Sequence, residues 1–370
     1  MSVDVATTDD NGTGRISVQL GQSVVEAGVT YRYFRCQIGF YTVSWPLSRW
    51  LAAHVKEYDL VHIHALFSFP STVAAFWANR RGVPYIVRPL GVLNTWGIRN
   101  RRPLLKRLSL RFIERRVLAG ASAAHFTSDQ EKCEAELALP GTRGIVIPNP
   151  VATPEAEMNP GPNVFLTRYP EVAGRRVILF LSRVDPKKGL DLLLDGFARV
   201  RAVLPDVVLV VAGNGDDAFV AQLQERARRL GAQQDIIWPG FLEGNMKRAA
   251  LAAARVFVLP SYSENFGIAV VEAMADGLPV IVSDQVGIQQ EIATADAGLV
   301  VSCNANEVSV AIQGILSDNA ARDQMARNAR RLAMEFSPPA VTARLLETYQ
   351  LIARKNHPIA GYVTAHLNQA

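Results

Sequence analysis

The feature that most limits the fold is a succession of strand, loop, helix and strand across residues 255–282. The apolar run over 255–259 has the composition of a strand buried on both faces of a parallel sheet. A polar loop over 261–265 follows, then a helical stretch over 266–275, and Gly277 and Pro279 end that helix before the next apolar strand. The loop therefore lies at the carboxyl end of its strand, where open α/β sheets bind ligands.

The same alternation recurs along most of the chain. In the first half, strands are expected at 3–8, 29–34, 59–64, 84–89, 123–127 and 145–150, and helices at 47–56, 70–81 and 104–119. In the second half, strands are expected at 176–182, 207–212, 235–238, 255–259, 280–283 and 298–301, with helices beginning near 190, 218, 246, 266, 289 and 306. Proline, glycine and asparagine are frequent over 153–170, which is typical of a linker.

This pattern predicts an α/β fold with two Rossmann-like domains that face a cleft. We expect a first domain over 1–165 and a second over 166–336. A terminal helix is expected over 337–356, and a tail over 357–370 that frays.

Two carboxylates, Glu264 and Glu272, flank the loop and the helix start with seven residues between them. At about 1.5 Å of rise per residue they are expected roughly 10–12 Å apart, which is too far for the carboxylate pair of a retaining glycosidase. The separation suits an extended ligand with a hydroxyl group at each end and an anion at the helix start between them. A nucleotide-sugar has that order of groups.

A second motif precedes this turn. Arg183 and Lys188 lie just past the strand at 176–182, in a loop that Pro186 and Gly189 keep out of regular structure. An arginine can bind two phosphate oxygens and a lysine can act as a point charge, which together stabilise a departing diphosphate without a metal. The alternative for Arg183 and Lys188 is that they belong to an exposed basic loop without a ligand. The alternative for the two glutamates is that they lie on a solvated helix face.

Together these motifs resemble those of the retaining glycosyltransferase family 4, which has the GT-B fold. The resemblance implies that Glu264 binds donor sugar hydroxyls, that Glu272 binds ribose, and that Arg183 and Lys188 bind the diphosphate. It also implies that the terminal helix crosses back onto the first domain. The remaining donor contacts are expected from the backbone of the helix start and from the loop that holds the base, at Asn265, Phe266, Gly267, Phe241 and Leu242.

In the first domain, His64 ends the strand at 59–64, so its imidazole is expected at the ligand-side edge. The resemblance implies that it contacts the transferred sugar near the reacting carbon. His62 is two residues earlier, so its side chain lies on the same face of the strand but deeper. The alternative for His62 is a core histidine whose hydrogen bonds are satisfied within the protein. The turn Gly213-Asn214-Gly215 is expected to be structural, and Arg88 either meets an acceptor phosphate or is an ordinary surface arginine.

Composition limits the compartment and the partners. Three scattered cysteines, Cys36, Cys133 and Cys303, indicate neither a disulfide framework nor a zinc site, so a cytoplasmic location is expected. No stretch stays apolar long enough to span a bilayer. The net charge is +5, and the stretch from Arg99 to Arg116 is strongly basic with the single acid Glu114. The helix at 104–119 is either a solvated charged face or a peripheral contact with anionic lipid at the inner face of the membrane.

The function we expect is the transfer of a hexose from a nucleoside diphosphate-sugar to a saccharide or lipid-linked saccharide, in polysaccharide or glycolipid synthesis. Retention of configuration is implied by the resemblance. No metal, no cofactor and no nucleic-acid partner are expected. The alternatives are a sugar-nucleotide epimerase or phosphorylase on the same fold, and a non-catalytic subunit that binds nucleotide-sugar or polysaccharide. A nicotinamide dehydrogenase is disfavoured, because no G-x-G-x-x-G follows the first strand.

One expectation concerns the start of the chain. The resembled family opens with a strand, a glycine-rich loop and a helix before the strand that 3–8 resembles, so this opening unit is expected to be missing. Its absence predicts that the strands at 3–8 and 61–64 are either separated by a gap or paired directly. Residues 16–20 alternate as a strand does rather than beginning a helix, and weak or no transfer activity is expected of the shortened chain.

Overall fold

The computed structural model describes residues 1–12, 14–93, 103–152 and 161–355. The chain divides into two compact units. Unit 1 comprises residues 1–147 and the chain from Arg344 onward, and unit 2 comprises residues 148–343. This division falls earlier than the predicted boundary at 165/166, because Val151 and Phe165 are buried in the core of unit 2.

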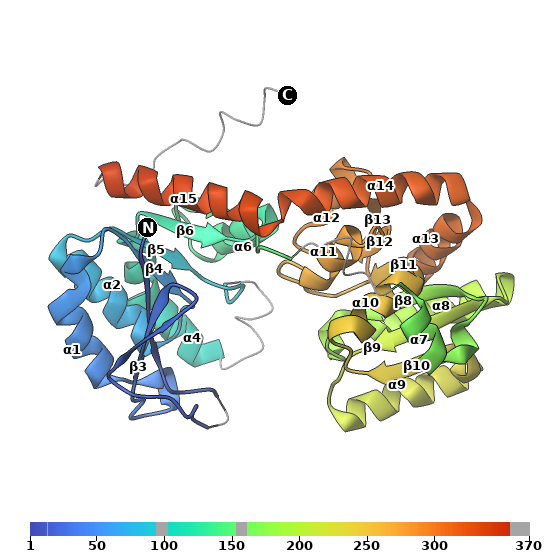
Figure 1. Ribbon diagram of the computed structural model, residues 1–370, viewed down its shortest axis with the longest axis horizontal. Helices are drawn as coiled ribbons and strands as arrows, with labels where there is room; N and C mark the ends of the chain where they lie inside the picture. The colour runs from blue at the N-terminus through green and yellow to red at the C-terminus, as the bar shows by residue number, and fades with distance from the viewer. Residues whose placement is uncertain (13, 94–102, 153–160, 356–370) are drawn as a thin grey trace. The chain divides into compact units, whose positions relative to one another are not determined.

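Unit 2 is built on one six-stranded parallel sheet in the order β10-β9-β8-β11-β12-β13 (Figure 1). The six strands agree with the predicted ones. Their bounds are β8 Arg176–Leu181, β9 Val207–Ala212, β10 Ile236–Gly240, β11 Ala254–Leu259, β12 Val280–Ser283 and β13 Gly298–Val301. All six residues of β9 are buried, as expected of a central strand covered on both faces.

The helices of unit 2 are α7 Asn163–Arg168, α8 Leu190–Val203, α9 Asp217–Arg229, α10 Gly244–Ala253, α11 Ile268–Ala275, α12 Gln289–Thr294, α13 Ala305–Ser317 and α14 Asn319–Glu335. Side chains of Asp216, Asn304 and Asp318 cap α9, α13 and α14. Two helices were not predicted. One is α14, and the other is α7, which lies inside the predicted linker because Phe165 anchors it in the core.

Unit 1 contains two separate sheets. The first has the order β1-β3-β2, with β1 Val3–Thr8, β2 Ser23–Glu26 and β3 Val29–Phe34. The second is parallel in the order β4-β5-β6-β7, with β4 Val61–His64, β5 Tyr85–Arg88, β6 Ala123–Phe126 and β7 Gly144–Val146. Of the two predicted arrangements, β1 and β4 therefore show the gap and not the direct pairing.

The predicted strand at 16–20 is wrong. This stretch is coil with single bridges at Arg15 and Leu20, and the strand β2 forms further along instead. Ala27 and Gly28, with φ of 50° and 80°, make the two-residue turn between β2 and β3. Positive φ at both turn positions matches the twist of a tight hairpin, so the strand forms beside its turn.

The helices of unit 1 are α1 Trp45–His54, α2 Phe69–Arg81, α4 Pro103–Ser109, α5 Arg115–Ala119 and α6 Asp129–Ala138. A π-helical turn, η3 Leu110–Glu114, joins α4 to α5, so the predicted basic helix at 104–119 exists but is not α-helical throughout. Arg99, Arg101 and Arg102 of the basic stretch lie outside the described residues. The helix α15 Pro338–Lys355 belongs to unit 2 up to Ala343 and to unit 1 from Arg344, and the tail 357–370 is outside the described residues.

Candidate functional site

The loop between β11 and α11 carries the first carboxylate, Glu264. Its backbone is fixed to the loop after β12, because Glu264 N donates to Gln285 O at 3.0 Å and Gly287 N donates to Glu264 O at 2.9 Å. The helix begins at Ile268, later than the predicted start at Phe266. Gly267 precedes it with φ of 91°, a left-handed conformation that favours glycine.

The start of α11 offers backbone donors. The first N–H groups of any helix have no partner inside it, and no side chain among the described residues caps α11. Phe266 contributes only its backbone here, since its side chain is buried and packs against Phe336 with ring centroids 5.6 Å apart. Asn265 lies in the same loop. This helix start is therefore suited to an anion.

Glu264 forms an ion pair with Lys188, through Oε2 and Nζ. Lys188 is only 6% exposed, and a buried lysine needs such a partner. Its loop is fixed on both sides, because Asp185 Oδ1 accepts from Lys187 N at 3.1 Å and Lys187 O accepts from Tyr262 N at 2.7 Å. Lys188 is thus held beside the first carboxylate and is not an isolated cation.

Glu272 lies in α11 and pairs with Lys247 of α10, with Oε1 and Nζ 2.8 Å apart. Both side chains are partly exposed, at 25% and 29%. Sequence reasoning missed Lys247, because nothing in the sequence of α10 indicates that this side chain faces α11. Each carboxylate of the turn consequently holds one ammonium group.

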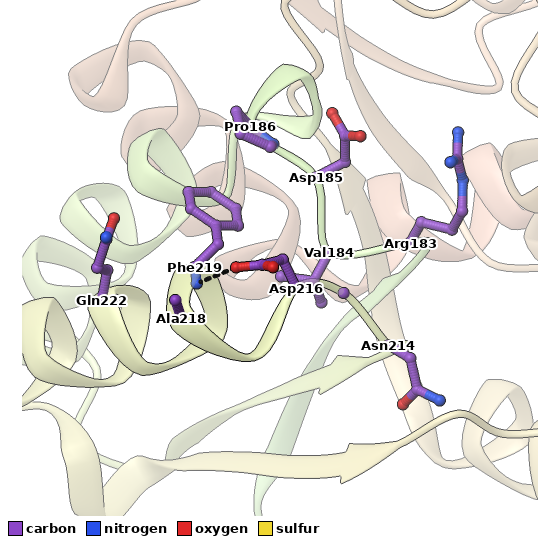
Figure 2. A pocket seen from close by; sticks show the side chains of 10 residues that line it. Arg183, Val184, Asp185, Pro186, Asn214, Asp216, Ala218, Phe219 and Gln222 are labelled. Atoms are coloured by element: carbon purple, nitrogen blue, oxygen red, sulfur yellow. Dashed lines mark hydrogen bonds between the residues drawn. The ribbon is translucent and has the colours of Figure 1, made fainter.

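Arg183 is exposed and lines a pocket of about 450 Å³. Figure 2 shows the loop from Arg183 to Pro186 beside the first turn of α9, with Asn214 and Asp216 from the loop after β9. Among the described residues, no side-chain hydrogen bond or ion pair occupies the Arg183 guanidinium. The pocket therefore offers a charged group to a ligand.

The glycine turn after β9 is structural, as predicted. A Cβ at Gly213 would overlap the carbonyl oxygen of Ser182, and one at Gly215 would overlap that of Val184. Val184 N also donates to Asn214 O at 2.8 Å. The two glycines thus let the turn pack against the loop that carries Arg183.

The two residues predicted to hold the base, Phe241 and Leu242, differ in how far they are exposed. Phe241 is 64% exposed just after β10, whereas Leu242 is 8% exposed and part of the core. Only the backbone of Leu242 is therefore available to a ligand, while the ring of Phe241 is free to stack.

In unit 1, His64 ends β4 with its side chain exposed, and it pairs in register with Arg88 of β5. Crowding by neighbouring protein atoms lowers the pKa of His64, and the charge of Arg88 lowers it further. Both residues lie at the carboxyl edge of their parallel strands, as the sequence predicted for His64.

His62 is partly buried with both ring nitrogens hydrogen-bonded, which agrees with the alternative of a satisfied histidine considered for it. His125 Nε2 must donate to Ile147 O, 2.7 Å away, because a carbonyl oxygen only accepts. In neutral rings this leaves His125 Nδ1 to accept from His62 Nε2 at 3.3 Å, and His62 Nδ1 to accept from Tyr349 OH at 2.6 Å. Burial lowers the pKa of His62 to about 2 and that of His125 to about 4. His125 and Tyr349 were not found from the sequence.

No set of three or more His, Cys, Asp or Glu side chains is arranged to hold a metal ion in the part of the chain that the structure describes. Within these same ranges, every helix is too short or too polar to cross a membrane.

Comparison with known proteins identifies the family. Residues 167–332 match the family described as glycosyl transferases group 1, and residues 1–150 match the glycosyl transferase 4-like domain. A phosphatidyl-myo-inositol mannosyltransferase of Mycolicibacterium smegmatis is 31% identical over 216 residues, covering 58% of this chain and 53% of that protein. A D-inositol 3-phosphate glycosyltransferase of Segniliparus rotundus is 29% identical over 243 residues, covering 64% and 51%. The chain spans about half the length of these curated relatives.

Solved structures share the fold. A sucrose-phosphate synthase from Thermosynechococcus elongatus superposes with a TM-score of 0.74 at 21% identity, over 95% of this chain and 89% of that one. Anabaena HepE in complex with UDP and glucose gives a TM-score of 0.69 at 21% identity, over 87% and 86%. These likenesses show the GT-B fold. Because two adjoining family matches together take in most of the residues, the chain belongs to the group 1 glycosyltransferases of the family 4 type.

Proposed function

We propose that this protein transfers a hexose from a nucleoside diphosphate-sugar to a saccharide or lipid-linked saccharide acceptor, with retention of configuration. The observation that carries the proposal is the pairing of Glu264 with Lys188 and of Glu272 with Lys247, one pair before α11 and one pair within it. An uncapped helix start lies between the two carboxylates. Each end of the proposed diphosphate site thus has a carboxylate that can accept hydrogen bonds from the hydroxyl groups of a ligand.

In this proposal the diphosphate lies at the start of α11. Lys188, together with the exposed Arg183, neutralises the charge that develops on the departing nucleoside diphosphate. Glu264 accepts hydrogen bonds from the donor sugar and Glu272 from the ribose, while Phe241 stacks on the base. His64 contacts the transferred sugar. The diphosphate is neutralised by these cations without a metal ion.

The names of the relatives support a phosphorylated or lipid-linked acceptor. Two of them are named for phosphatidyl-myo-inositol and for D-inositol 3-phosphate, and a structural relative is described with UDP and glucose. We propose an acceptor of that class, with Arg88 beside its phosphate.

The test is binding and turnover with a panel of UDP- and GDP-hexoses. Calorimetry with the preferred donor is expected to show that Arg183→Ala weakens binding about tenfold or more, because it removes a charge-assisted hydrogen bond. Arg255→Ala is the matched control, since Arg255 is also exposed but lies at the other end of β11. Equal affinity in both variants contradicts the site, and donor binding without turnover favours the non-catalytic alternative.

We further propose that the helical segment 103–119 contacts anionic lipid. Its buried face carries Leu110, Glu114, Val117 and Leu118. Its opposite face exposes both apolar and basic side chains, namely Leu104, Leu105, Leu108 and Phe112 together with Arg107, Arg111, Arg115 and Arg116. Exposed apolar groups flanked by arginine are typical of a helix that lies at a membrane surface.

Vesicle co-sedimentation tests this contact. Phosphatidylcholine vesicles that contain phosphatidylglycerol are expected to bind the protein, and phosphatidylcholine alone is expected to bind it poorly. The double variant Leu108→Ser with Phe112→Ser is expected to lose binding. Leu137→Ser is the matched control, because Leu137 is 83% exposed on α6 of the same unit. Binding that is unchanged by the double variant excludes this face.

A further inference from the structure

The loop that follows His64 adopts a strained conformation. Ala65 and Phe67 have φ of 75° and 58°, in the left-handed region that residues with a side chain rarely adopt. Such conformations persist only where neighbouring groups fix them, and they concentrate at functional sites. Ala65 N donates to Arg88 O at 2.9 Å, which fixes the beginning of the loop. The group that fixes its far end is Glu114.

Glu114 is fully buried, and its Oε1 accepts three hydrogen bonds. The donors are Tyr41 OH at 2.8 Å, Ser109 Oγ at 2.9 Å and Phe67 N at 3.1 Å. Tyr41 is also left-handed, with φ of 62°. A single carboxylate oxygen therefore joins two strained loops to the helical segment 103–119.

The π-helical turn η3 makes this arrangement possible. Ser109 and Glu114 are five residues apart, and at about 100° per residue an α-helix would direct them about 140° apart around its axis. A π-helical turn, with its i→i+5 spacing, brings the two side chains onto one face. Such turns are rare and are frequently found at functional sites, so the helix geometry and the strained loops indicate the same place.

Stability alone does not explain this geometry. Oε2 of Glu114 is buried without a hydrogen-bond partner among the described residues, and a buried polar atom left without a hydrogen bond costs free energy. The three hydrogen bonds at Oε1 are formed despite that cost, which points to a role for them in holding the loops.

We propose that Glu114 is a positioning residue for His64. By holding the Phe67 N–H, Glu114 keeps the loop in its left-handed conformation and the imidazole at the end of β4. The inference rests on the proposed function, because it takes His64 as the residue beside the transferred sugar. A shift of His64 by about 1 Å is enough to lower the rate as much as a hundredfold.

The test compares Glu114→Leu with Glu114→Gln in the full chain. Leucine fills the buried volume without an acceptor, whereas glutamine retains a carbonyl oxygen for Phe67 N. Glu114→Leu is expected to move the ¹⁵N-imidazole NMR signals of His64 and to lower kcat about tenfold to a hundredfold, with the dissociation constant of the free nucleoside diphosphate unchanged. Glu114→Gln is expected to keep the His64 signals and kcat close to those of the wild-type protein. His64 signals in Glu114→Leu that match the wild-type protein overturn the proposal.

Tyr85→Phe is the matched control. Tyr85 OH donates to Val117 O at 2.8 Å, so this variant also removes a buried hydrogen bond to the same helical segment, but it does not touch the His64 loop. It is expected to leave the His64 signals in place, and an equal shift of those signals in this control contradicts the proposal. If the wild-type protein transfers no sugar, the proposed function fails, while the His64 signals still decide the role of Glu114.

A measurement on the wild-type protein covers the case in which Glu114→Leu does not fold. The amide proton of Phe67 is expected to exchange with solvent at least about a hundredfold more slowly than in an unstructured peptide, because its N–H is held by Glu114. Exchange at the unprotected rate overturns the proposal.

Discussion

The Nζ of Lys188 and the Oε2 of Glu264 form an ion pair in which both side chains are largely buried, at 8% and 16% exposure. The two residues come from different loops at the carboxyl edge of the sheet of unit 2, after β8 and after β11. The pair therefore joins the proposed phosphate-binding loop to the proposed sugar-binding turn. Its loss is expected to affect both stability and donor binding.

A double-mutant cycle tests the stability of this pair. Lys188→Met and Glu264→Leu are each expected to lower the free energy of unfolding by about 2–3 kcal/mol, because each leaves a largely buried charge without its partner. The double variant is expected to lose about 1–3 kcal/mol less than the sum of the two. Urea denaturation measures all four proteins. Additive losses would show that the two groups do not interact.

The second carboxylate has its own matched control. Glu272→Ala is expected to weaken nucleotide-sugar and free nucleoside diphosphate alike, by about 1.5–3 kcal/mol, because its proposed partner is ribose. Lys247→Met removes the same ion pair but keeps the carboxylate, so it is expected to leave both affinities nearly unchanged. Calorimetry decides this. A similar loss in both variants would mean that Glu272 acts through the fold.

Two glycines with nearly equal φ allow the stability cost of steric overlap to be measured separately from the cost of backbone strain. Gly189 has φ of 69°, and a Cβ there would overlap the carbonyl oxygen of Pro260, whereas Gly231 has φ of 68° and open space around it. Gly231→Ala is expected to cost about 1 kcal/mol of stability. Gly189→Ala is expected to cost about 1–3 kcal/mol more, and to weaken nucleoside diphosphate binding because Lys188 moves. Thermal unfolding and calorimetry measure the two effects, and equal costs would contradict the packing argument.

The buried histidines predict a loss of stability in acid. Their lowered pKa values, about 2 for His62 and about 4 for His125, mean that the folded chain stays unprotonated while the unfolded chain, with pKa about 6.5, binds protons. Their contribution is thus present above pH 6.5 and is lost as the pH falls towards 4, by at most about 1.4 kcal/mol per pH unit for each ring. Among the described residues, His64, Arg88 and Tyr349 are the other ionisable groups that act on His62.

Thermal unfolding between pH 7 and pH 5 checks this dependence. His62→Gln removes one of the two rings from the titration, so its melting temperature is expected to fall less steeply over that range. A slope equal to that of the wild-type protein would show that His62 is not buried in its neutral form.

Chelation tests the proposed electrostatics of the donor site. Turnover is expected to survive EDTA, because Arg183 and Lys188 supply the positive charge that a metal ion otherwise gives to a departing diphosphate. Initial rates with and without EDTA measure the effect. Loss of turnover that magnesium restores would contradict this assignment of charge.

The sequence by itself determined which segments of unit 2 form strands. Strands such as Val207–Ala212 are continuous apolar runs because both of their faces are buried, so they were found without any neighbour being known. The turn that carries Glu264 and Glu272 was found for the same reason, since it directly follows such a strand. The roles of individual side chains in that turn stay predictions.

Only the tertiary structure decided which groups meet. Lys247 is 25 residues from Glu272, and Tyr349 is 287 residues from His62, so no local spacing announces either contact. The strand Ser23–Glu26 and the helix Asn163–Arg168 escaped prediction because one depends on pairing across a tight turn and the other on the burial of Phe165 by distant residues. The local sequence pattern indicates which face of a helix or strand is buried. Which other segment packs against that face depends on the path of the whole chain.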